Sequence, residues 1–174
     1  SMKVYDLGAA WERFRTKRER FYLEEADGIW TYRRHFDRSI AVVWEALVAP
    51  ELKLRWMIDV SAIRVDNAEN RLGTGTDFHC SHVAAEFRYW VTDWEPFDYF
   101  STRMNDPGRQ GISMPETYQL ASTESGTELR YTLGQAHDAD GVRSEVTEEE
   151  SMGFLEQFWP PCFDLLEEIT NETN

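Results

Sequence analysis

Apolar residues near the start of the chain follow a helical spacing. Positions at alternating intervals of three and four form one stripe, which is interrupted only by Arg18 and comprises Val4, Leu7, Trp11, Phe14 and Phe21. This pattern predicts an amphipathic helix over residues 3–25. The stripe needs a covering surface, which is either the body of the domain or the same helix of a second subunit in a homodimer.

After this helix, apolar residues occur at every second position, which predicts a strand from Ile29 to Asp37. Ser39 then offers a side-chain oxygen that can cap a helix. That helix buries one face and ends before Pro50. The fixed backbone angle of Pro50 suits the first turn of a second helix, which reaches about Trp56.

Short segments of strand composition follow, separated by turn-forming residues at the intervals of an antiparallel meander. They lie near residues 58–65, 75–82, 86–95, 98–104, 114–122 and 127–135. Glutamates from Glu148 to Glu150 then place negative charge at the start of a last helix, where the helix dipole favours it. Pro160 and Pro161 remove two backbone donors, so we expect a kink or a break with restart there.

This order of elements predicts an α+β helix-grip fold. One strand, two helices and six further strands build a seven-stranded curved antiparallel sheet around a long C-terminal helix, with an extra helix at the N-terminus. We expect residues 3–25 to form that N-terminal helix and residues 28–170 to form a helix-grip ligand-binding domain.

Composition narrows the range of partners. The 174 residues fit one domain, and a hydrophobic share of 41% is ample for its core. A formal net charge of −14 argues against nucleic acid, because nucleic acids bind clustered Lys and Arg. No apolar run is long enough to span a bilayer, and no signal-peptide pattern is present, so we expect a cytoplasmic protein without membrane insertion.

One stretch carries a family resemblance. Residues Arg34 to Ser39, followed by Val43-Trp44-Glu45-Ala46-Leu47 and Pro50-Glu51, resemble the opening of the START-related superfamily. This superfamily, also called SRPBCC, includes polyketide-cyclase-like and birch-pollen-allergen-like proteins. The resemblance extends from about Ile29 to Ile169, although members usually have proline where this chain has Ser39.

A second stretch, Gly73 to Cys80 followed by Asp93 to Phe97, is similar to domains sometimes attached to signalling enzymes such as nucleotide cyclases. Together the resemblances imply a cavity that binds lipid-like or aromatic molecules. Members of the superfamily include binders, cyclases and chaperone activators, so the fold does not select among these functions.

Alternate residues of each strand should face such a cavity if the sheet wraps the last helix. In each strand we take the more apolar of the two alternating sets of residues, and we add two residues of the last helix. The candidate ligand-binding residues are Tyr32, Arg34, Phe78, Cys80, His82, Tyr89, Phe100, Met104, Tyr118, Tyr131, Phe158 and Trp159. This set depends on strand register, because a slip of one residue turns a whole strand over.

Arg34 is the strongest functional candidate, because a cation in an apolar pocket needs an anionic partner. Two alternatives remain for that partner: an anionic ligand, or an Asp or Glu of the protein itself. His79, Cys80 and His82 do not indicate a metal, because in a strand only Cys80 and His82 face the same way. We expect neither a metal nor a cofactor.

No motif for nucleophilic catalysis, phosphate binding or dinucleotide binding occurs in the sequence. We therefore expect a binding protein for a small hydrophobic or amphipathic molecule, acting as a sensor or carrier without catalysis. One alternative is a cyclase- or aromatase-like enzyme with His82 as base and a tyrosine as proton donor. The other is a protein-interaction module of a signalling or chaperone system.

Overall fold

One antiparallel sheet forms the body of the protein. The computed structural model describes residues 20–66, 71–82, 85–143 and 148–172. Its strands are β1 (Gly28–Phe36), β2 (Val60–Val65), β3 (Asp77–His82), β4 (Glu86–Glu95), β5 (Tyr99–Asn105), β6 (Ser113–Thr123) and β7 (Gly126–Gly134). They lie in the order β1-β7-β6-β5-β4-β3-β2, so that β1 pairs with the last strand of the chain.

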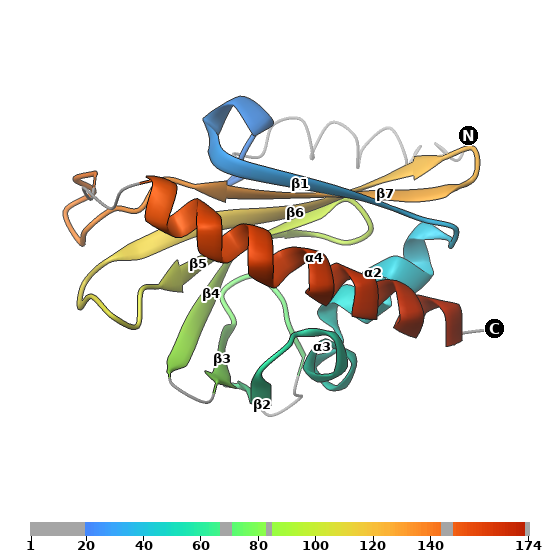
Figure 1. Ribbon diagram of the computed structural model, residues 1–174, viewed down its shortest axis with the longest axis horizontal. Helices are drawn as coiled ribbons and strands as arrows, with labels where there is room; N and C mark the ends of the chain where they lie inside the picture. The colour runs from blue at the N-terminus through green and yellow to red at the C-terminus, as the bar shows by residue number, and fades with distance from the viewer. Residues whose placement is uncertain (1–19, 67–70, 83–84, 144–147, 173–174) are drawn as a thin grey trace, which may run out of the picture.

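The helices pack on one face of this curved sheet (Figure 1). They are α2 (Ile40–Val48), α3 (Pro50–Trp56) and α4 (Glu148–Glu172), and a short 3-10 helix, η1 (Glu25–Asp27), precedes β1. The helix α4 runs along the sheet, and both α2 and α3 contact it. We call the sheet face that packs against α4 the inner face and the opposite face the outer face. The predicted α+β helix-grip fold is confirmed.

The two short helices follow the predicted boundaries, with Pro50 in the first turn of α3. Ser39 stands at the N-cap position of α2, but its side chain makes no capping hydrogen bond. Its backbone carbonyl instead accepts hydrogen bonds from the N–H groups of Val42 at 3.1 Å and Val43 at 3.2 Å. The predicted capping role of the hydroxyl is therefore wrong, although the helix starts where it was expected.

Strand register places aromatic residues opposite one another on the inner face. Tyr32 of β1 pairs with Tyr131 of β7, and Tyr131 pairs with Tyr118 of β6. Tyr118 in turn pairs with Phe100 of β5, so an aromatic row crosses four strands. Direct cross-strand neighbours of this kind stabilise a sheet and give α4 a continuous apolar surface to cover.

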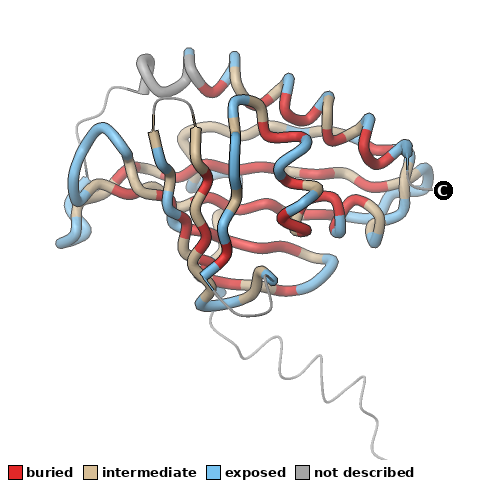
Figure 2. Tube along the Cα trace, turned by 90° about the horizontal axis from the view of Figure 1, so that it is seen from below, coloured by how far each residue is buried: buried red, intermediate tan, exposed pale blue. Residues whose placement is uncertain are grey.

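The helix α4 continues through Pro160 and Pro161, so of the two expected outcomes, a kink or a break with restart, the break does not occur. Buried residues gather on the side of α4 that faces the sheet (Figure 2). The hydrophobic ones are Leu155, Trp159, Cys162, Phe163, Leu166 and Ile169. Packing of this apolar face holds the helix together where the prolines remove hydrogen bonds. No helix within the described ranges is long and apolar enough to cross a membrane.

Residues 20–24, which we call the strap, cross the outer face without regular secondary structure. The backbone N–H of Phe21 donates to Asp93 Oδ2 at 3.0 Å, and that of Leu23 donates to Thr117 Oγ1 at 3.1 Å. These bonds use donors that a helix would need, so the helix predicted over 3–25 does not extend into the strap. Its residues 3–19, and the homodimer predicted to form through them, lie outside the described residues.

Candidate ligand site

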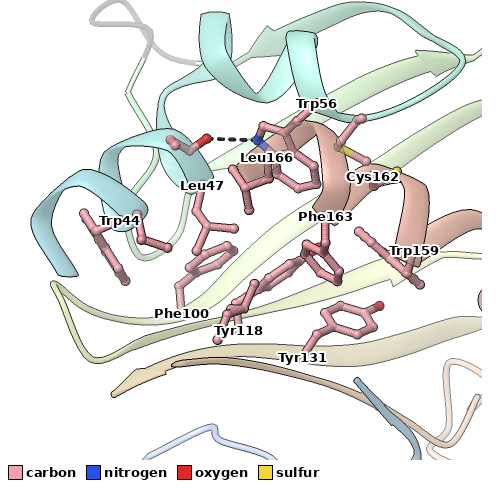
Figure 3. Packing of buried hydrophobic residues seen from close by; sticks show 14 of the residues in the cluster. Trp44, Leu47, Trp56, Phe100, Tyr118, Tyr131, Trp159, Cys162, Phe163 and Leu166 are labelled. Carbon is pink, nitrogen blue, oxygen red and sulfur yellow. Dashed lines mark hydrogen bonds between the residues drawn. The ribbon is translucent and has the colours of Figure 1, made fainter. Parts of the chain in front are cut away.

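The structure brings most of the predicted candidate residues together between the inner face and α4, a region that we call the grip interior. Eight of them are buried in one hydrophobic cluster: Phe78, Cys80, Tyr89, Phe100, Met104, Tyr118, Tyr131 and Trp159. Tyr32 and Phe158 are half-buried and pack against that cluster. Figure 3 shows Trp159 and Phe163 of α4 pointing toward Tyr118 of β6 and Tyr131 of β7.

Aromatic rings occupy the centre of the grip interior. The ring of Tyr131 lies 4.5 Å from Trp159 and 4.8 Å from Tyr118, measured between centroids. Phe163 stacks on Trp159 at 5.5 Å and on Tyr32 at 5.3 Å. Walls of this kind suit apolar and aromatic molecules, and a bound molecule must displace some of these side chains.

Arg34 does not enter the grip interior as a free cation. Its guanidinium pairs with Asp164 Oδ1 at 2.8 Å and donates from Nε to Glu167 Oε2 at 3.1 Å. Both carboxylates lie on α4, and the Arg34 side chain is 28% exposed. Of the two partners that the sequence left open, the structure places carboxylates of the protein beside Arg34.

His82 lies at the end of β3, beside the rings of Phe87 at 4.9 Å and Phe158 at 6.3 Å. Its Nε2 is buried and has no hydrogen-bond partner among the described residues. Burial lowers the pKa of His82, so the imidazole is neutral at pH 7. Within the described ranges no hydrogen bond joins His82 directly to Tyr118 or Tyr131, the groups that the enzyme alternative assigns as base and proton donor.

The neighbouring His79 points away from the grip interior. Its Nδ1 lies 2.8 Å from Glu86 Oε1, and its Nε2 lies 3.1 Å from Asp66 Oδ2. His79 and His82 thus face opposite ways, as strand alternation predicts. No group of three or more His, Cys, Asp or Glu side chains is arranged to hold a metal ion in the part of the chain that the structure describes.

Sequence reasoning missed two charged residues in the grip interior, and Lys53 is the first. This residue of α3 is 2% exposed, whereas the adjacent Leu54 is 38% exposed. The ammonium lies over the rings of Trp56, Tyr118 and Phe78, with Nζ-to-centroid distances of 4.5, 5.3 and 5.8 Å. Burial lowers the pKa of Lys53, and the nearby Cys80, Glu116 and Cys162 oppose that change.

Glu116 of β6 is the second missed residue and is 1% exposed. Thr102 Oγ1 donates to its Oε1 at 2.6 Å, and the Tyr131 hydroxyl donates to its Oε2 at 2.6 Å. Burial raises the pKa of the Glu116 carboxyl, while these two hydrogen bonds and the charge of Lys53 act in the opposite direction. Alternation offered a way to find Glu116, because it lies two residues before the inward-facing Tyr118.

The two cysteines are buried and free. Burial raises the pKa of Cys80 to about 11 and that of Cys162 to about 11. Both are therefore neutral thiols at pH 7, and neither has the thiolate character of a nucleophile. They contribute small apolar groups to the grip interior.

A depression of about 750 Å³ lies elsewhere, on the outer face. The strap lines it together with outward-facing residues such as Arg103 and Thr117, and Thr102 and Glu116 of the same strands also border it. None of the twelve predicted candidate residues lines this depression. The buried polar groups and the aromatic walls of the grip interior make that region the better candidate for a ligand site.

A curved antiparallel sheet that grips a C-terminal helix around an aromatic interior defines a helix-grip protein. Residues 37–171 match the family described as Activator of Hsp90 ATPase homolog 1-like protein. The chain belongs to this family, and so to the SRPBCC superfamily. No curated protein sequence matches the chain at a significant level.

Solved structures share this fold. Protein MLL2253 from Mesorhizobium loti is 20% identical, with a TM-score of 0.67, and the match covers 83% of this chain and 98% of that one. Ara h 8.0201 is 12% identical with a TM-score of 0.62, over 83% of this chain and 97% of that one. DynU16, from the dynemicin biosynthetic locus, is 18% identical with a TM-score of 0.60, over 82% of this chain and 46% of that one.

Proposed function

We propose that this protein binds a small hydrophobic or amphipathic molecule in the grip interior and acts as a carrier or sensor rather than an enzyme. The observation that carries the proposal is the presence of Lys53 and Glu116 among aromatic rings, each nearly inaccessible to water. Buried charged groups lower stability unless they are fully compensated, so a core built for stability alone would not contain them. Polar groups set in apolar walls are the usual composition of a ligand site.

The end of the grip near His82 is the route of entry. His82, Phe87 and Phe158 are half-buried there, whereas Trp159 and Phe163 further along α4 are 3% and 0% exposed. The buried Nε2 of His82, which lacks a partner among the described residues, would meet a polar group of an entering molecule. Rotation of the Phe158 side chain would open a path along α4.

Titration with Nile red, a neutral apolar fluorophore, tests the proposal. We expect saturable binding of one dye per chain with increased emission, and competition by 1-dodecanol. Folded protein, verified by circular dichroism, that gives no saturable signal with any apolar probe would rule out the proposed function.

Paired variants locate the bound dye. Phe158→Glu places a carboxylate among the rings at the entry and should weaken Nile red binding about tenfold or more. Phe97→Glu is the matched control, because Phe97 is 51% exposed in the turn between β4 and β5. Equal loss of binding in both variants would place the dye on the surface instead of in the grip interior.

A further inference from the structure

The register of α3 buries a lysine and exposes a leucine. Pro50, Lys53 and Trp56 are the buried residues of this helix, three positions apart, and Trp56 Nε1 donates to the Ala46 carbonyl at 2.9 Å. That bond and the packing of Trp56 fix the rotation of the helix, so Lys53 has to point inward (Figure 3 shows Trp56 and its bond). Leu54, at 38% exposed, would fill an apolar interior more favourably.

The surroundings of Lys53 compensate its charge only in part. The closest ring, Trp56 at 4.5 Å, supplies a cation–π interaction. This interaction offsets only part of the cost of removing an ammonium from water. The nearby thiols of Cys80 and Cys162 are neutral at pH 7, because burial raises the pKa of each to about 11.

The nearby carboxyl group is engaged elsewhere. Both oxygens of Glu116 accept hydrogen bonds from hydroxyl groups, those of Thr102 and Tyr131. Lys53 forms none of the ion pairs found among the described residues, and the charge of Glu116 acts on it only at a distance. An ammonium has three donors, so Lys53 keeps donors for a bound molecule.

We propose that the molecule bound in the grip interior carries a carboxylate or a similar oxyanion and that the Lys53 ammonium contacts this head group. This inference rests on the proposed binding function and adds the chemical class of the ligand. An oxyanion supplies the direct, hydrogen-bonded charge partner that Glu116 does not provide, because both Glu116 oxygens accept from Thr102 and Tyr131. Charge-assisted hydrogen bonds are about twice as strong as neutral ones. The rings of Phe78, Tyr118 and Trp56 around Nζ accommodate the apolar part next to that head group.

Dodecanoic acid and 1-dodecanol provide a matched pair of probes, because they share the chain length and differ in the head group. Competition against Nile red at pH 7 measures both affinities. We expect the acid to bind the wild-type protein about tenfold to a hundredfold more tightly than the alcohol. In Lys53→Met this preference should disappear, while Nile red still binds.

Arg55→Met is the control for loss of a positive charge from α3. The Arg55 side chain is 48% exposed and pairs with Glu172 at 2.6 Å on the surface, so this variant should keep the preference for the acid. Glu116→Gln should keep or increase it, because a negative charge near the head group is removed.

The outcomes separate this inference from the proposed function. If no apolar probe binds the wild-type protein, the proposed function itself fails. If Nile red and dodecanol bind but the acid has no advantage, only the assignment of Lys53 to an oxyanion fails. Retention of the preference in Lys53→Met also overturns it. The wild-type comparison needs no variant, so absence of a preference for the acid overturns the inference even if Lys53→Met does not fold.

Discussion

Tyr131 donates its hydroxyl hydrogen to Glu116 Oε2 at 2.6 Å, and both side chains are almost completely removed from water. The bond links β7 to β6 beneath α4. A second hydrogen bond, from Thr102 of β5 to the other carboxyl oxygen of Glu116, adds a third strand. Three neighbouring strands thus share one polar network inside an aromatic layer. Such a network is stable only while each buried group keeps a partner.

Glu116→Ala should lower the free energy of unfolding more than Glu116→Gln. Alanine leaves the buried hydroxyls of Thr102 and Tyr131 without their acceptor, whereas glutamine can accept from one and donate to the other. We expect a difference of about 1–3 kcal/mol between the two variants, measured by urea denaturation. Equal stability would show that the hydroxyls find other partners.

The stability contributed by Lys53 should depend on pH in the alkaline range. Burial lowers its folded-state pKa below the unfolded value of 10.5, so in the window between the two the unfolded chain binds more protons. Wild type should therefore gain stability relative to Lys53→Met as pH rises through the lowered pKa toward 10.5. The titratable groups that act on or contact Lys53 are Cys80 of β3, Glu116 and Tyr118 of β6, and Cys162 of α4.

These groups are present in both proteins, so the difference between the two melting curves reports Lys53 together with its effect on the pKa values of Cys80, Glu116 and Cys162. Differential scanning calorimetry at several pH values from 6 to 10 measures it. Arg55→Met serves as the comparison, because its cation lies on the surface of the same helix. A difference that falls with rising pH would contradict burial of a charged lysine.

Arg34→Met should have little effect on ligand binding. The guanidinium pairs with Asp164 and Glu167 at a partly exposed position, and surface ion pairs contribute about 0–1 kcal/mol. We expect a loss of stability in that range and an affinity for dodecanoic acid within about twofold of wild type. A large loss of affinity for the acid in Arg34→Met, with Lys53→Met unaffected, would return the anchoring role to Arg34.

Much of the fold could be predicted because its determinants are local. Period-two spacing and turn residues located the strands, and Pro50 marked where α2 ends and α3 begins. The same alternation placed residues such as Phe78 and Tyr131 on the inner face. The spacing of apolar residues did not predict which charged side chains are buried, because this depends on tertiary packing.

The features that the sequence did not predict are the burial of Lys53, the identity of the Arg34 partners and the course of the strap. Each is determined by contacts with other elements and not by local spacing. Lysine is seldom buried, so nothing in the sequence singled out Lys53 as an interior residue. The bond between Trp56 and the Ala46 carbonyl fixes the rotation of α3 that turns Lys53 inward. Arg34 shares a face with Tyr32, but the carboxylates that pair with it come from α4, more than a hundred residues away. The strap likewise departs from its helical pattern because the sheet offers it hydrogen-bond acceptors.

Two adjacent strap residues should differ sharply in their effect on stability. The ring of Tyr22 packs edge-on against Tyr99 at 4.9 Å, and its hydroxyl accepts a hydrogen bond from Arg130 at 2.5 Å. Phe21 is 60% exposed and is held mainly through its backbone. Tyr22→Ala should lower the free energy of unfolding by about 2–4 kcal/mol, and Phe21→Ala by less than about 0.5 kcal/mol. Urea denaturation of both variants measures the contrast, and equal effects would mean that the strap does not pack on the outer face in solution.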